Sequence, residues 1–151
     1  MKVVAILLVL FSLTTQLAKE QCKCLPASKD QQTSWGQENV IIKPDEAFKQ
    51  LRGKVLAPTE DALEGVLVEV YDKPEGLLMD WKERKARKVQ QRKVAACLTG
   101  PNGQFCFSKL SAGQYELRAS KPNGWNATSM YVVVDPKSAI SEFIVPLHLA
   151  H

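Results

Sequence analysis

Two cysteines, Cys97 and Cys106, stand on either side of the turn sequence Gly-Pro-Asn-Gly, which occupies positions 100–103. Paired thiols can bind zinc, exchange electrons or form a structural disulfide. Structural zinc sites use close pairs such as C-x2-C, completed by further cysteines or by histidines, and redox pairs are commonly C-x-x-C. Here the spacings are C-x-C and C-x8-C, and both histidines lie at the C-terminal end. We therefore predict a structural disulfide, with no metal and no cofactor.

The register of the hairpin around this turn decides whether the two sulfurs meet. If the four turn residues form the whole loop, Cys97 lies opposite Cys106, at a Cα separation that a disulfide can span. A tighter Asn-Gly loop would place Thr99 opposite Cys106 instead. The symmetric spacing favours the first register and a bond between Cys97 and Cys106. The pairing of Cys22 and Cys24 stays open, because four cysteines allow three connectivities.

The N-terminus has the plan of a secretory signal, which would place the cysteines in an oxidising compartment. Lys2 precedes an apolar run from Val3 to Phe11, and polar residues follow. A membrane-spanning helix would need about 20 apolar residues. We therefore predict a signal peptide over residues 1–20 and a secreted or periplasmic protein. A lipid-anchored Cys22 is the alternative, although the residues before it lack the small side chains we expect there. The remaining chain is long enough for one domain.

Residues 21–45 are largely polar and are interpreted as a strap or tether, whereas residues 46–151 alternate short apolar runs with turn residues. Alternation with period two and frequent turns indicate an antiparallel sandwich or barrel. The sequence predicts an all-β, seven-stranded antiparallel Greek-key sandwich. The predicted strands are 51–57, 65–71, 94–99, 104–108, 114–119, 129–134 and 140–147.

One segment, 74–93, breaks this pattern and is predicted to be a helical insert. It is rich in residues that favour helix, and it carries seven basic and three acidic residues, so 7 − 3 = +4, the formal charge of the whole chain. Such a patch could bind an acidic partner. The alternative is that its apolar residues dock on the sandwich while the cations only face water. The candidate contact residues are Trp81, Lys82, Arg84, Lys85, Arg87, Lys88, Arg92 and Lys93, with Trp125 as a separate aromatic that could stack on a sugar or cap the core.

Several pieces between Leu51 and Val134 together resemble the carboxypeptidase regulatory-like domain, a small sandwich with a transthyretin-like (prealbumin-like) fold. They are Gly53-Lys-Val, Leu63-Glu-Gly-Val-Leu-Val-Glu-Val-Tyr71, Thr99-Gly-Pro-Asn-Gly-Gln-Phe105, Leu110-Ser-Ala-Gly-Gln-Tyr-Glu-Leu117 and Asn123-Gly-Trp125. The resemblance implies a secreted protein of bacterial type, with Tyr115 in the core. The insert at 74–93, the cysteine pair and the strap depart from the family pattern.

The resemblance implies a non-enzymatic binding or structural module of the cell envelope. Its predicted partners are a protein, including a membrane protein, or an acidic polysaccharide or other envelope component, and peripheral membrane contact is a further alternative. Nucleic acid is not expected, because interleaved stacking aromatics are lacking. The rival hypothesis is a small secreted metal-dependent or hydrolytic enzyme on the same fold. Against it, the sequence has no Gly-x-Ser-x-Gly elbow and no glycine-rich phosphate loop.

Overall fold

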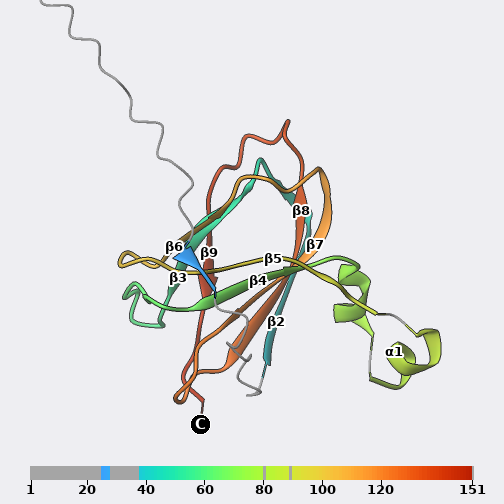
Figure 1. Cartoon of the computed structure of the whole chain (residues 1–151), viewed down its shortest axis with the longest axis horizontal. Helices are drawn as coiled ribbons and strands as arrows, with labels where there is room; N and C mark the ends of the chain where they lie inside the picture. Colours follow the sequence, from blue (N-terminus) through green and yellow to red (C-terminus); the bar gives the residue numbers. More distant parts are fainter. Residues whose placement is uncertain (1–24, 28–37, 80, 89, 151) are drawn as a thin grey trace, which may run out of the picture.

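The computed structural model describes residues 25–27, 38–79, 81–88 and 90–150, which form two packed β-sheets and a short helical insert (Figure 1). The predicted signal peptide and most of the predicted strap lie outside these residues. Among the described residues, no helix is long and apolar enough to cross a membrane. The elements are β1 (Leu25–Pro26), β2 (Glu38–Phe48), β3 (Leu51–Leu56), β4 (Leu67–Tyr71), η1 (Pro74–Leu78), α1 (Trp81–Arg87), β5 (Lys93–Leu98), β6 (Gln104–Phe107), β7 (Gly113–Ser120), β8 (Ala127–Val134) and β9 (Phe143–Pro146).

The all-β sandwich predicted from the sequence is confirmed, with two differences in its strands. One sheet has the order β1-β5-β4-β7-β8-β2 and the other the order β6-β3-β9, so the described residues form nine strands rather than seven. The pairs β2–β8 and β3–β9 are parallel, so the sandwich is not purely antiparallel. The strand β2 begins inside the segment that we interpreted as a polar strap. Its place in the sheet depends on pairing with β8, a partner distant in sequence.

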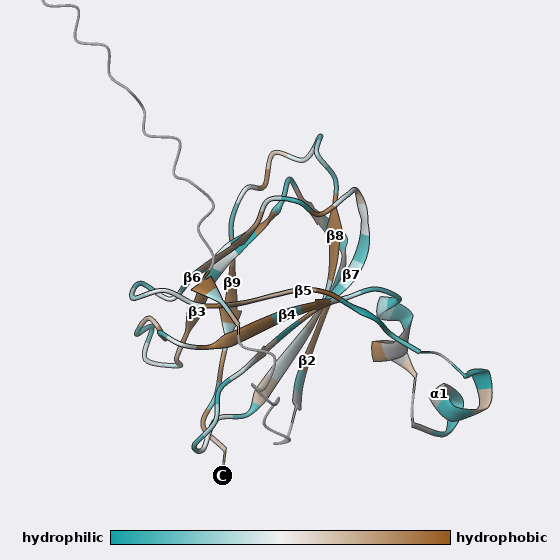
Figure 2. Cartoon of the chain, in the orientation of Figure 1, coloured by the Kyte–Doolittle hydropathy of each residue, from teal (hydrophilic) through white to brown (hydrophobic). Residues whose placement is uncertain are grey.

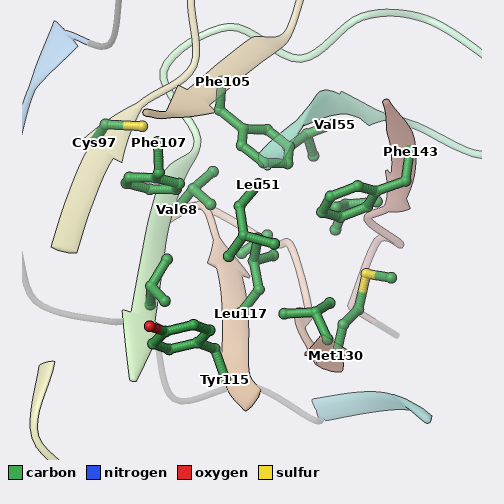
Figure 3. Packing of buried hydrophobic residues seen from close by; sticks show 14 of the residues in the cluster. Leu51, Val55, Val68, Cys97, Phe105, Phe107, Tyr115, Leu117, Met130 and Phe143 are labelled. Atoms are coloured by element: carbon green, nitrogen blue, oxygen red, sulfur yellow. The ribbon is translucent and has the colours of Figure 1, made fainter. Parts of the chain in front are cut away.

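Alternate residues of both sheets fill the space between them, as the period-two pattern predicted (Figure 3). Phe143 is central to the aromatic part of this core, with ring centroids 4.3 Å from Phe48 and 5.6 Å from Phe105. Tyr115 belongs to the same cluster, and its hydroxyl donates a hydrogen bond of 2.9 Å to the carbonyl of Ser111. The predicted role of Tyr115 in the core is therefore confirmed. Full burial of one large apolar side chain contributes about 1.5–3 kcal/mol.

Gly53 explains how β3 can lie so close to β9. A Cβ atom built on Gly53 would lie 2.1 Å from the carbonyl oxygen of Phe143 and 3.1 Å from the ring of Phe105. Any side chain there would push the two parallel strands apart. The small sheet therefore requires glycine at this position.

Candidate functional site

The insert grows out of the loop between two neighbouring strands of the large sheet, β4 and β5. Tyr71 at the end of β4 pairs with Lys93 at the start of β5. One residue further, the backbone N–H of Asp72 donates to the carbonyl of Arg92 (3.0 Å), and the N–H of Arg92 donates to the Asp72 carboxylate (2.7 Å). The insert thus begins and ends at one closed hairpin neck.

Only part of the insert is helical, which corrects the prediction of a helix across 74–93. The 3-10 turn η1 packs against β7 and β8, and α1 has seven residues. Lys88, directly after α1, has φ of 51°, a left-handed conformation typical of helix ends. The residues that favour helix predicted α1, but the helix ends after seven residues, where Lys88 adopts this left-handed conformation.

Two buried carboxylates on the outer face of the large sheet anchor the base of the insert. Glu69 is 2% exposed and Glu116 is fully buried. The Lys93 ammonium lies 3.0 Å from Glu69, while Glu116 accepts hydrogen bonds from Gln91 (2.6 Å) and Arg118 (3.0 Å). A buried charge is tolerated when it is paired and hydrogen-bonded. These contacts fix the second half of the hairpin neck onto β4 and β7.

Tyr71 lies within the same network. Burial of its hydroxyl, and secondarily the negative charge of Glu69, raise the pKa of Tyr71 to about 12. The guanidinium of Arg118 opposes this rise only in part, and its central carbon lies 5.5 Å from the Tyr71 ring centroid. At neutral pH the tyrosine is therefore an uncharged donor beside Glu69, and its chemistry is structural.

The cations that remain directed to solvent belong to α1 and the residue after it. Lys82, Lys85, Arg87 and Lys88 are exposed, and Figure 1 shows α1 projecting away from both sheets. Figure 2 shows this projection as mainly hydrophilic, in contrast to the apolar strands. Within α1, the Arg87 guanidinium lies 3.8 Å from the Glu83 carboxylate, one helical turn away.

The predicted basic patch therefore divides into two parts with different roles. Arg92 and Lys93 pair with Asp72 (3.5 Å) and Glu69 (3.0 Å) of the sheet. They serve mainly to close the neck. Trp81 and Arg84 lie in α1. We name the exposed set Lys82, Lys85, Arg87 and Lys88 the cationic knob. The sequence could not identify Glu69 and Glu116 as anchors, because a carboxylate at an outward strand position is normally solvated.

Trp125 does not belong to this surface. It packs partly against the hydrophobic core and forms an isolated bridge with Leu149. Trp125 precedes the first residue of β8, whereas the hairpin neck is aligned with Tyr131 within that strand through Glu116 and Tyr71. These contacts favour the interpretation of Trp125 as a residue that caps the core. The neighbouring Asn126 is only 8% exposed, and the hydroxyl of Thr128 donates to the carbonyl of Pro146 (2.7 Å). Asn126-Ala-Thr128 matches the N-glycosylation sequon, but attachment of a glycan would require the Asn126 side chain to become exposed.

The hairpin that carries the cysteines differs from the predicted four-residue loop. The N–H of Gly100 donates to the carbonyl of Gln104 (3.0 Å), so Gln104 faces Gly100 and not Thr99. The pairing ends here, because β5 continues in the six-stranded sheet and β6 in the three-stranded sheet. Cys97 belongs to the hydrophobic core, whereas Cys106 lines a surface cavity of about 290 Å³ with Phe107, Lys109 and Leu110. Both cysteines are disulfide-bonded, and the predicted bond between them stays a prediction.

No group of three or more histidine, cysteine, aspartate or glutamate side chains is placed to hold a metal ion in the part of the chain that the structure describes. The cavity beside Cys106 has largely apolar walls. The carboxylates at the hairpin neck, Asp72, Glu69 and Glu116, form ion pairs with basic side chains, and Glu116 also accepts a hydrogen bond from the Gln91 amide.

Comparison with known proteins identifies the family. The model of the carboxypeptidase regulatory-like domain matches residues 50–145, which is more than half of the chain. The chain belongs to the carboxypeptidase regulatory-like domain family. The match runs from the residue before β3 to within β9, so β1 and β2 lie outside it, whereas the basic insert lies within it. Carboxypeptidase regulatory-like domains are non-catalytic.

Other comparisons add no functional information. No curated protein matches the chain. Among solved structures, the crystal structure of 3-chlorocatechol 1,2-dioxygenase from Rhodococcus opacus 1CP is similar, with 12% identity and a TM-score of 0.40 over 80% of this chain and 70% of that one. A likeness this distant carries no argument about activity.

Proposed function

We propose that this chain is an exported, non-enzymatic binding module of the cell envelope, and that the cationic knob binds an acidic polysaccharide. The observation that carries the proposal is the position of the knob. Four exposed cations stand on a projection whose base is fixed by buried carboxylates. A fixed base reduces the conformational entropy that binding would otherwise cost.

The chemistry of the knob favours a polyanion over a lipid surface. Peripheral membrane binding by a helix requires apolar side chains beside the cations. Among the side chains whose exposure the structure describes, the exposed large hydrophobic residues lie outside the insert: Leu25, Val40, Ile42, Ile140, Ile144 and Leu149. A hydrated polymer that carries carboxylate or sulfate groups matches clustered lysines without apolar contact.

The proposal is tested with the mature protein on immobilised heparin and hyaluronate, with neutral dextran as the reference matrix. The knob variant combines Lys82→Gln, Lys85→Gln and Lys88→Gln. The control variant combines Lys49→Gln, Lys54→Gln and Lys137→Gln, three exposed lysines elsewhere on the sandwich. Both variants lose the same net charge, so only the position of the charge differs.

We expect the wild type and the control to bind the acidic matrices with similar affinity, and binding to weaken as salt rises. Three exposed contacts at about 0.5 kcal/mol each predict a roughly tenfold weaker affinity for the knob variant. Equal losses in both variants would indicate non-specific charge attraction and contradict the proposal. Binding of the wild type to phosphatidylserine vesicles in place of the polysaccharides would also contradict it.

A further inference from the structure

We propose that two copies of this chain pair through the free edge of β2 and form a symmetric dimer. The strand β2 is the last strand of the six-stranded sheet, and among the described residues no strand lies on its other side. An unpaired edge presents backbone N–H and C=O groups to which another strand can hydrogen-bond. Antiparallel pairing of two β2 strands would join the large sheets of both copies into one continuous sheet.

The edge formed by β2 lacks the features that usually protect an edge strand from pairing. Such features include short length, proline, charged side chains and bulges. The other three edge strands of the described chain are short, because β1 has two residues and β6 and β9 have four each. By contrast, β2 has 11 residues, and its first part, Glu38–Ile42, pairs with β8 without interruption. The register shift and Pro44 come only after Ile42.

Two apolar side chains on this edge are exposed to solvent. Ile41 packs against the hydrophobic core. Its neighbours Val40 and Ile42 point to the opposite, outer face of the sheet, because side chains alternate along a strand, and each is 48% exposed. A partner strand that covered both of them would remove apolar surface from water, which favours association.

The sequence of β2 is complementary to itself in one antiparallel register, which favours a second copy as the partner. When Ile41 lies opposite Ile41 of the second copy, Val40 lies opposite Ile42 of the second copy on both sides of the twofold axis. The same register places Asn39 opposite Lys43, and it places no like charges opposite each other. Apolar side chains that face each other directly across two strands stabilise the pairing.

The neighbouring registers are less favourable. A shift of one residue would bring the outer face of one copy against the inner face of the other. A shift of two residues places Ile42 opposite Glu38 in one direction, and in the other it places Val40 opposite Pro44, which has no N–H to donate to the ladder. We therefore expect the twofold axis to pass beside Ile41.

The proposed contact is short, and it belongs to a part of the chain outside the matched family domain. The family model matches residues 50–145, and β2 ends at Phe48. Stable interfaces bury about 1,200–2,000 Å² in total, and pairing of a single short edge lies at the low end of this range. We therefore expect a reversible dimer whose population rises with protein concentration. The dimer would carry two copies of the cationic knob, but the inference does not depend on the proposed polysaccharide binding.

The test is sedimentation equilibrium of the mature, oxidised protein over a range of concentrations. The repulsive variant combines Val40→Glu with Ile42→Glu, and the complementary variant combines Val40→Glu with Ile42→Lys. The control variant combines Ile140→Glu with Ile144→Glu, two exposed isoleucines outside β2. The repulsive and control variants change the net charge equally, so only the position of the charge differs.

We expect the wild type and the control variant to form dimers with similar dissociation constants. In the repulsive variant, the introduced glutamates face each other across the twofold axis, which should raise the dissociation constant by roughly tenfold or more. In the complementary variant, each introduced glutamate faces an introduced lysine of the second copy, so the dimer should persist. Circular dichroism of each variant checks that the sandwich is folded.

Three results would overturn the proposal. The first is a wild type that stays monomeric at every concentration, which decides the question even if a variant folds poorly. The second is dimerisation that the repulsive variant leaves unchanged or that the control variant abolishes. The third is a complementary variant that is as monomeric as the repulsive one, because the proposal rests on the register in which positions 40 and 42 face each other.

Discussion

At the scale of single residues, Tyr71 gives the clearest dependence on pH. Its pKa is raised from 10.0 to about 12 by burial and by the charge of Glu69. The folded state therefore holds this proton more tightly than the unfolded state. The stability linked to it is fully present below pH 10 and is lost as pH rises through 12.

We expect the free energy of unfolding to fall between pH 10 and 12, and to fall less steeply in Tyr71→Phe, which has no hydroxyl to ionise. Urea titrations of both proteins at several pH values in this window measure the difference. An absorbance titration at 295 nm provides the control, because the component near pH 12 should disappear in the variant. Identical slopes for the two proteins would show that Tyr71 does not carry the effect.

At the scale of elements, the hairpin between β5 and β6 depends on Gly103. Its φ is 68°, and an added Cβ would lie 2.6 Å from the carbonyl oxygen of Val55, whose own N–H donates to the Gly103 carbonyl. Gly103→Ala therefore combines left-handed strain of about 1–2 kcal/mol with a clash against β3 backbone. We expect a total loss of about 3 kcal/mol in chemical denaturation.

Gly124 supplies the matched control for this substitution. Its φ is also positive, at 88°, but an added Cβ would meet no atom within 4 Å. Gly124→Ala should show the conformational strain without the clash, about 1 kcal/mol. If the two substitutions cost the same, close packing of the turn against β3 is not what the glycine provides.

The same hairpin shows where sequence reasoning ends. Composition and the alternation of apolar residues predicted the turn, its flanking strands and the inward direction of Phe105 and Phe107. They did not predict the register, because three-residue and four-residue loops fit the same turn residues and differ only in which backbone groups pair. For the insert, the sequence predicted a helix and a positive charge. It did not predict the anchoring by Glu69 and Glu116, because that anchoring depends on strands that become neighbours only in the folded sheet.

At the scale of the whole molecule, the sandwich and its family were predictable because core positions recur with period two over most of the domain. The two additional strands were not, since β2 gains its position from a parallel partner far along the chain. A two-residue strand such as β1 leaves no periodic signal at all. The strands that the sequence missed therefore lie at the two edges of the six-stranded sheet, where pairing with distant residues positions them.

The disulfides act on the whole molecule, because their contribution to stability depends on which loops they close. Cys97 and Cys106 are both disulfide-bonded. A bond between them would close one short loop and contribute about 2–3 kcal/mol. Bonds to Cys22 and Cys24 would close loops of roughly 75–85 residues; the first would contribute about 4 kcal/mol and the second about 3 kcal/mol, because the first bond already shortens the second loop. At roughly 3 °C per kcal/mol, reduction should lower the Tm by less than about 10 °C for the short loop and by about 20 °C for the long loops, measured by circular dichroism with and without dithiothreitol. The double substitution Cys22→Ser with Cys24→Ser distinguishes the two pairings, because a double variant that still loses stability on reduction places the stabilising bond between Cys97 and Cys106.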